Sequence, residues 1–100
     1  RLLLTGSRSG GICIVDIDAS KGGFENFAAY EAQHPPALPP LFTVRSPSGG
    51  LHLYYRPRRA WRTVTDRPCP GVDLRGEGGV AMVPGSVHPK GGIFRIEDRP

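Results

Sequence analysis

Fourteen glycines and eleven prolines interrupt this 100-residue chain so often that only short elements fit between them. These residues favour tight turns, so we expect that long helices do not dominate the fold. The runs between the turns predict one helix, at residues 24–34, and five or six strands, within 12–18, 41–45, 51–55, 71–74, 79–83 and 91–96. This mixture predicts a small α+β domain with a mixed, largely antiparallel sheet and one or two helices. The length allows a single domain, residues 1–100, with a modest core.

The composition narrows the classes of protein to consider. No apolar stretch approaches the ~18 residues of a membrane-spanning helix, so we expect no membrane partner. Cys13 lies in a strand pattern and Cys69 between two prolines, which is a poor disulfide framework, and no C-x-x-C pair offers a zinc site. We therefore expect a reducing, cytoplasmic location and no zinc. The net charge of +4 is a mild indication of binding to polyanions.

The apolar run at residues 11–15 leads into two aspartates, Asp16 and Asp18. Residues two apart on a strand share a face, so these carboxylates project side by side, repel each other and lose solvation. A divalent cation is the usual remedy, and Asp73 in a second strand-like segment offers a third carboxylate. Oxygen ligands of this kind suit Mg²⁺ or Mn²⁺, particularly together with phosphates. The plainer alternative is a pair of strand-end carboxylates facing water.

A glycine-rich turn at Ser48, Gly49 and Gly50 forms a second candidate site. Such a turn lets the backbone approach a ligand closely, and its N–H groups favour an anion. His52 follows directly, in a strand where it shares a face with Tyr54. The alternative for His52 is an ordinary half-buried strand histidine.

Arg75 follows Asp73 by two residues and so faces the same side of its strand. One interpretation is an ion pair with Asp73. The other is a forked donor to triphosphate oxygens, a role that suits the geometry of arginine.

The stretch at residues 56–62 is basic and carries the only tryptophan of the chain. Arginine and tryptophan together suit contact with phosphates and stacking on bases. The candidate nucleic-acid-binding residues are Arg58, Arg59, Trp61 and Arg62. A solvated loop anchored by one tryptophan is an equally open interpretation.

Three segments, in this order, resemble the motifs of the bifunctional DNA primase/polymerase (prim-pol) family, within the archaeo-eukaryotic primase superfamily. They are Asp-x-Asp at 16–18, Ser-Gly-Gly-x-His-x-Tyr at 48–54, and Gly-Val-Asp-x-Arg-Gly-x-Gly-Gly at 71–79. Similar flanking segments at 5–10 and 83–88 extend the resemblance over nearly the whole chain. Gly85 stands where the family more often has proline, and Phe94 where tyrosine is common.

The resemblance implies an RRM-like catalytic core that transfers nucleotides to a primer 3′-hydroxyl, directed by a DNA template. It implies two Mg²⁺ or Mn²⁺ ions, held by three catalytic carboxylates: Asp16, Asp18 and Asp73. Seven residues form the expected binding set for a dNTP or NTP: Ser48, Gly49, Gly50, His52, Arg75, Ser86 and His88. For the last two, which lie in a proline- and glycine-rich loop, a turn-forming role is equally open.

The family's domain normally has a further helix and strand upstream of the segment that resembles its entry. We therefore expect a core truncated at its N-terminus, a loss that bears on stability and turnover. The chain is then one part of a larger replication protein of a bacterium, phage or plasmid, with a fused or associated helicase as a further partner.

Two other functions remain open at this point. A metal-dependent phosphodiesterase or nuclease would use the same carboxylates but would not need a triphosphate site. A non-catalytic nucleic-acid-binding remnant of the family would show salt-dependent binding that does not respond to replacement of Asp16.

Overall fold

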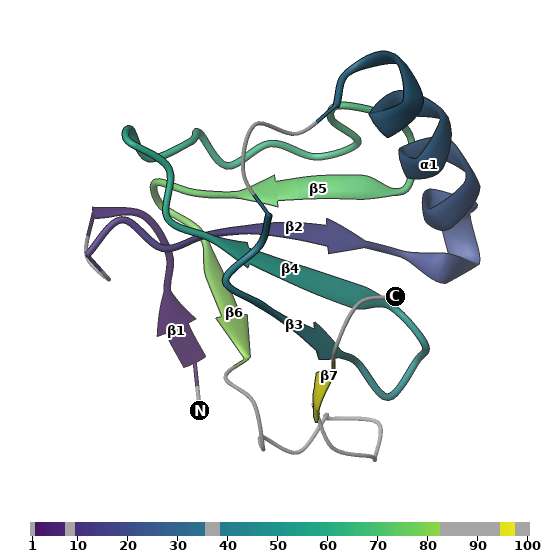
Figure 1. Ribbon diagram of the computed structural model, residues 1–100. Helices are drawn as coiled ribbons and strands as arrows, with labels where there is room; N and C mark the ends of the chain where they lie inside the picture. Colours follow the sequence, from purple (N-terminus) through teal and green to yellow (C-terminus); the bar gives the residue numbers. More distant parts are fainter. Residues whose placement is uncertain (1, 8–9, 36–38, 83–94, 98–100) are drawn as a thin grey trace.

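The computed structural model describes residues 2–7, 10–35, 39–82 and 95–97 (Figure 1). Along the chain, the elements are β1 (Leu2–Leu4), β2 (Cys13–Ile17), the short 3-10 helix η2 (Ala19–Lys21), α1 (Gly23–Gln33), β3 (Phe42–Arg45), β4 (Leu51–Tyr55), β5 (Val72–Arg75), β6 (Val80–Met82) and β7 (Arg95–Glu97). The predicted α+β class is confirmed. Two of the predicted nucleotide-binding residues, Ser86 and His88, lie outside the described residues.

The main sheet has five strands in the order β5-β2-β4-β3-β7, and every neighbouring pair is antiparallel. Its first four strands, numbered from β2 along the chain, therefore stand in the order 4-1-3-2. This is the split β-α-β arrangement, in which α1 crosses over from β2 to β3 and β4 returns between them. The second crossover, residues 56–71, is fully described and contains no helix. Figure 1 shows α1 on one side of the sheet, near β2 and β5.

The two faces of this sheet are buried differently, because successive strand residues point to opposite sides. The face on the α1 side carries the larger core, in which Phe27 of α1 packs with five strand residues: Val15, Ile17, Leu51, Leu53 and Val72. The other face has a smaller apolar cluster: Ile14, Val44 and Tyr54. The predicted alternation in β4 is thus confirmed, because His52 and Tyr54 face away from α1 while Leu51 and Leu53 face toward it.

The helix has clear local boundaries. Gly22 precedes it with a positive φ of 71°, and the helix ends at Gln33, just before His34 and Pro35. Phe24, Phe27 and Tyr30 follow at helical spacing and pack against the sheet core. Among the residues that the structure describes, no helix is both long and apolar enough to cross a membrane.

Two features of the topology differ from what the sequence pattern suggested. The strand β1 was not expected, and it pairs with β6 in a separate two-stranded antiparallel sheet. Consequently β5 and β6, on either side of the turn at residues 76–78, belong to different sheets. The entry segment holds this turn in place, since Thr5 donates its N–H to Gly79 O and Ser7 binds the Glu77 carboxylate. The predicted strand at 91–96 overlaps β7 only at its end, and residues 91–94 lie outside the described ranges.

Candidate active site

Asp16 is the centre of a row of polar residues that crosses three strands of the main sheet. It lies opposite His52 of β4 on one side and opposite Asp73 of β5 on the other. Directly opposed residues project from the same face. That face is the one turned away from α1, because the neighbours of Asp16 in β2, Val15 and Ile17, are part of the α1-side core.

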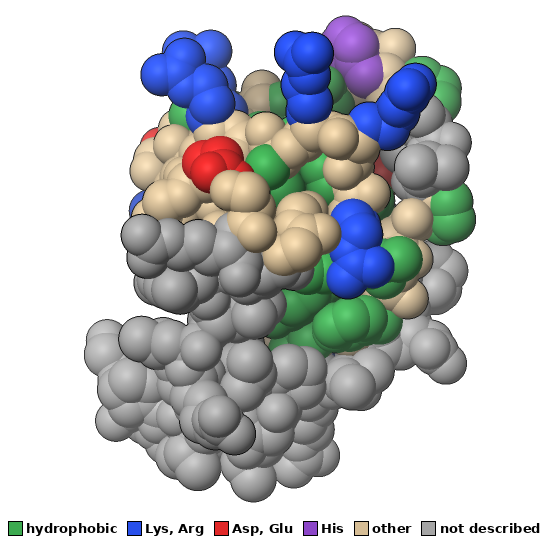
Figure 2. Space-filling model, turned by 90° about the vertical axis from the view of Figure 1, so that its left-hand side faces the viewer, with side chains coloured by type: hydrophobic (Ala, Val, Ile, Leu, Met, Phe, Trp, Pro, Cys, Tyr) green, Lys and Arg blue, Asp and Glu red, His purple; other side chains and the backbone are tan. Residues whose placement is uncertain are grey.

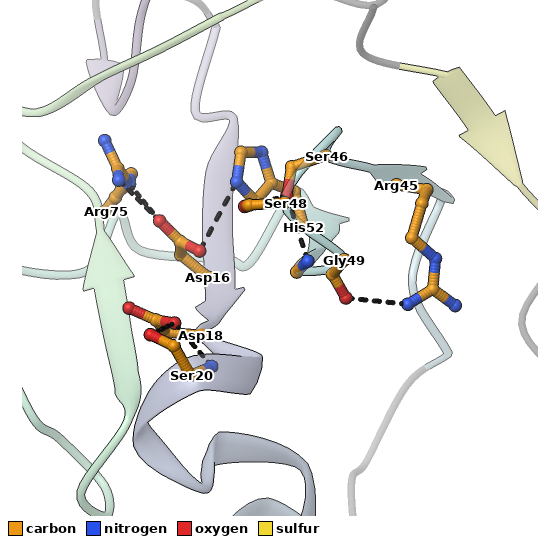
Figure 3. Close-up of polar contacts among 10 residues, drawn as sticks. Asp16, Asp18, Ser20, Arg45, Ser46, Ser48, Gly49, His52 and Arg75 are labelled. Atoms are coloured by element: carbon orange, nitrogen blue, oxygen red, sulfur yellow. Dashed lines mark hydrogen bonds and ion pairs between the residues drawn. The ribbon is translucent and has the colours of Figure 1, made fainter. Parts of the chain in front are cut away.

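Two basic side chains hold the Asp16 carboxylate (Figure 3). Arg75 donates from Nε to Asp16 Oδ2 at 3.1 Å, and its Nη2 binds the same oxygen. His52 Nε2 lies 3.3 Å from Asp16 Oδ1, and His52 is buried. Burial raises the pKa of Asp16, but the hydrogen bond and charge of His52, together with Arg75, outweigh it, so that the pKa falls below its ordinary value. The carboxylate is therefore held ionised in a mostly buried position.

The partner of Arg75 was not foreseen. Of the two interpretations drawn from the sequence, the ion pair with Asp73 is wrong, because Arg75 binds Asp16 on the neighbouring strand. Arg75 lies opposite Ile14, which makes Asp16 its diagonal neighbour. A diagonal separation of ~7–8 Å is within reach of a long side chain. This pair can be found only when the register of β2 against β5 is known, and local sequence patterns do not give that register.

The other two predicted carboxylates have separate partners. Asp18 caps the short helix η2, where its Oδ1 accepts from Ser20 N at 2.9 Å and from Ser20 Oγ at 2.7 Å. Asp73 Oδ1 accepts from the backbone N–H of Asp66 at 2.9 Å, and Asp66 Oδ1 in turn accepts from Gly71 N at 3.1 Å. Sequence reasoning missed both Ser20 and Asp66.

The three carboxylates lie at neighbouring positions but do not converge on one point in this conformation. Among the described residues, no three acidic, histidine or cysteine side chains form a group able to hold a metal ion. The donor chemistry nevertheless fits a hard cation. Asp16 and Asp73 are directly opposed like charges, an arrangement that is unfavourable without compensation, and Asp18 follows two residues along the chain. Arg75 supplies the compensating charge here.

The glycine-rich turn after β3 is held by its own hydrogen bonds. The N–H of Gly49 donates to Ser46 O, and the N–H of Gly50 donates to Ser46 Oγ, each at 3.0 Å. Ser48 Oγ lies 3.1 Å from Ser46 Oγ, and Arg45 Nη1 donates to Gly49 O at 3.0 Å (Figure 3). Both N–H groups that the sequence analysis assigned to an anion are thus used inside the turn. Nucleotide binding at this turn stays a prediction, and binding through these two N–H groups requires their present hydrogen bonds to break.

Gly71 holds the start of β5 against the end of β2. Its φ is +83°, and a Cβ on it would lie 2.7 Å from Gly23 Cα. Its carbonyl oxygen accepts from Asp18 N at 2.8 Å. The glycine that opens the third motif therefore lets the start of β5 lie directly against the residues that follow β2, next to Asp18.

The basic segment, residues 56–62, lies at the opposite side of the sheet from the Asp16 row. Its four arginines are exposed: Arg56, Arg58, Arg59 and Arg62. Trp61 is half-buried, its ring lies 5.5 Å from that of Tyr55, and it packs against the α1-side core. Its backbone is also bound, since its N–H donates to Cys13 Sγ and its carbonyl accepts from Glu77 N. Trp61 is thus an anchor, and contact of this segment with nucleic acid stays a prediction.

Comparison with profiles of protein families matches residues 2–100 to the family described as bifunctional DNA primase/polymerase, N-terminal. The chain belongs to this family. The resemblance drawn from the three motifs is confirmed, and the match spans nearly the whole sequence. Searches among curated proteins and among solved structures gave no significant match. Membership of the primase/polymerase family indicates a function related to DNA priming or polymerisation, whereas the chemistry must be argued from the site.

Proposed function

We propose that this primase/polymerase domain transfers nucleotides to the 3′-hydroxyl of a template-paired DNA strand, with release of pyrophosphate. The observation that carries the proposal is the row formed by Asp73, Asp16 and His52 across β5, β2 and β4, with Arg75 on the central carboxylate. Asp16 and His52 lie on the interior strands β2 and β4, where ionisable side chains are uncommon, and such residues often belong to a functional site.

The carboxylates would hold the metal ions on which this chemistry depends. Asp16, Asp18 and Asp73 are the proposed ligands of Mg²⁺ or Mn²⁺. When bound, the ions supply electrostatic stabilisation to the attacking and leaving oxygens of phosphoryl transfer. Asp66 keeps Asp73 in place through its backbone N–H, and Ser20 does the same for Asp18.

Arg75 and His52 are the proposed contacts of the nucleotide triphosphate. Arg75 keeps about a third of its side-chain surface exposed while its guanidinium binds Asp16. A bidentate contact with phosphate suits the geometry of a guanidinium. If Arg75 exchanged the Asp16 carboxylate for a phosphate of the nucleotide, its positive charge would still have an anionic partner. His52 lies on the far side of Asp16, next to the turn that carries Gly49 and Gly50.

A primer-extension assay tests the proposal. Asp16→Asn and Asp73→Asn are each expected to abolish extension with Mg²⁺ or Mn²⁺, because each removes a carboxylate and keeps the shape of the side chain. Glu25→Gln is the matched control, since Glu25 is an exposed carboxylate on α1, on the other side of the sheet. Extension by Asp73→Asn at the rate of the parent would contradict the assignment. Shortening of the primer by the parent, in place of extension, would indicate a nuclease.

A further inference from the structure

A pocket of about 500 Å³ lies on the α1 side of the sheet, away from the Asp16 row. Val15 of β2 and Leu74 of β5 contribute to it from the sheet. The segment at residues 56–71 passes beside it, as the second crossover of the split β-α-β fold and without a helix of its own. The pocket volume is within the range of ~300–1,000 Å³ that is typical of sites for small organic ligands.

Aromatic rings line this pocket from two different elements. On α1, Phe27 and Tyr30 stack with centroids 6.3 Å apart, and Tyr30 and His34 stack at 4.5 Å. Their spacing of three and four residues puts them on one side of the helix. From β4 and the segment after it come Tyr55 and Trp61, whose rings lie 5.5 Å apart. A flat ring entering the pocket therefore meets aromatic side chains from both elements.

The surroundings of the pocket are cationic. Arg56 is itself a lining residue, and Arg58 and Arg59 follow it as exposed side chains. Figure 2 shows Lys and Arg side chains gathered along the upper part of one face, with hydrophobic surface between and below them. Glu31 is the one acidic lining residue. An apolar aromatic pocket beside several arginines has the chemistry with which proteins bind single-stranded nucleic acid without sequence preference.

We propose that this pocket receives an unpaired base of a single-stranded nucleic acid, with the strand's phosphates on the arginines of the basic segment. The charge decides between this occupant and an apolar peptide, because the arginines would gain nothing from the latter. The site is distinct from the proposed nucleotide site, since Val15 and Asp16 point to opposite faces of β2. It would hold a strand outside the catalytic face and does not depend on metal ions.

The single tryptophan of the chain lines the pocket, so its fluorescence reports on occupancy directly. The 100-residue chain is titrated with a short oligothymidylate and with an abasic strand of the same length and charge, in the presence of a chelator. Oligothymidylate is expected to quench Trp61, and the abasic strand is not. An oligouridylate arm shows whether the site prefers DNA or RNA. Equal quenching by the abasic strand, or none by either base-bearing strand, would overturn the proposal.

Variants locate the binding in the pocket. Tyr30→Leu and His34→Ala are expected to weaken oligothymidylate binding about five-fold or more, because each removes a stacking ring. Phe42→Leu is the matched control, since Phe42 is an exposed aromatic residue outside the pocket. His34 is exposed, so His34→Ala keeps the test valid if Tyr30→Leu does not fold. Equal weakening of oligothymidylate binding by Phe42→Leu would contradict the proposal. So would a loss of Trp61 fluorescence that accompanies self-association of the protein, measured by sedimentation in the absence of any nucleic-acid strand.

One further variant separates this site from the catalytic proposal. Asp16→Asn should lose primer extension and keep the full quenching by oligothymidylate, because its side chain lies on the other face. Loss of quenching in that variant, with the fold intact by circular dichroism, would count against a separate site. Retained quenching together with retained extension would leave the pocket supported and contradict the metal-ligand role of Asp16.

Discussion

Arg75 of β5 binds Asp16 of β2 diagonally across the strand pair, and Asp73, two residues before Arg75, lies directly opposite the same aspartate. The guanidinium binds Asp16, whereas the Asp73 carboxylate is held by the backbone N–H of Asp66. The positive charge of Arg75 on Asp16 compensates for the repulsion between Asp16 and Asp73, where the interior strand β2 meets β5 at the edge of the main sheet. The diagonal contact also places Arg75 beside the residues that would hold the metal ions.

Arg75→Gln tests how much the contact between Arg75 and Asp16 contributes to the stability of the fold. It leaves the mostly buried Asp16 carboxylate without its guanidinium, so we expect a loss of ~1–3 kcal/mol in the free energy of unfolding. Arg62→Gln, at an exposed arginine of the basic segment, is the matched control and should change stability by less than ~0.5 kcal/mol. Urea denaturation measures both. Equal stabilities of the two variants would mean that the Asp16–Arg75 pair contributes nothing to the fold.

A pair of glycine substitutions separates backbone strain from close packing. Gly49 and Gly71 both have positive φ, 91° and 83°, but only Gly71 has backbone atoms where a Cβ would lie. Gly49→Ala should cost ~1–2 kcal/mol from the left-handed conformation alone. Gly71→Ala should cost a further ~1–3 kcal/mol, because β5 must move away from Gly23. Thermal unfolding compares them, and a smaller cost at Gly71 than at Gly49 would disprove the close approach.

His52→Ala is expected to weaken nucleotide binding more than template binding. The reason is its position on the catalytic face, beside Asp16 and next to the turn of Gly49 and Gly50. Calorimetry with a dNTP and fluorescence anisotropy with a labelled DNA strand measure the two affinities. Glu25→Gln, at an exposed residue of α1 outside the pocket, serves as a control and should leave dNTP affinity unchanged. If His52→Ala lowered only the affinity for DNA, His52 would have to be assigned to the template.

The arginines of the basic segment should act through charge. Removing one arginine that binds a phosphate should reduce the slope of log K against log salt concentration by roughly 0.7 for a single strand. The double variant Arg58→Ala and Arg59→Ala is therefore expected to flatten the slope and leave base preference unchanged. A salt titration by anisotropy gives the slope. A slope equal to that of the parent would show that these two side chains do not touch the strand.

The two cysteines should react at very different rates. Burial raises the pKa of both thiols, and at Cys13 a hydrogen bond from Trp61 N–H opposes the effect while Glu77 adds to it. Cys13 is fully buried, whereas Cys69 is partly exposed. Iodoacetamide attacks the thiolate, so alkylation of Cys69 should keep rising as the pH passes its ordinary pKa of 9.0. Mass spectrometry should find Cys13 alkylated only in urea. Comparable labelling of both cysteines in the native protein would contradict the buried position.

Apolar patterns and the turn residues between them were enough to predict most of the main sheet. The strand at 12–18, the helix at 24–34 and the hairpin around the turn at 46–50 all lie within a few residues of β2, α1, β3 and β4. The strand at 12–18 is an apolar run that ends in two aspartates, and the helix has apolar residues at helical spacing. Glycine or proline lies near the ends of each segment. The strand β1 was missed because three consecutive leucines carry no period. Its pairing with β6 is a long-range choice that no local pattern encodes.

The candidate site was predictable in its residues but not in its contacts. Asp16, Asp73 and His52 could be named from their motifs, and the register brings them into one row. The partner of Arg75 depends on that register, which could not be predicted from local sequence patterns. The support that Asp66 gives to Asp73 depends on a loop in which Asp66 itself has a positive φ of 54°. An aspartate in an irregular segment gives no signal of such a role.

The strand β2 serves both faces of the sheet through consecutive residues. Val15 forms part of the pocket, and Asp16 is the centre of the polar row. Because side chains alternate with a period of two, a shift of β2 by one residue would move the Asp16 carboxylate into the α1-side core and put an apolar neighbour, Val15 or Ile17, in its place. A change of one residue in the length of β2 would thus disrupt the pocket and the polar row at once.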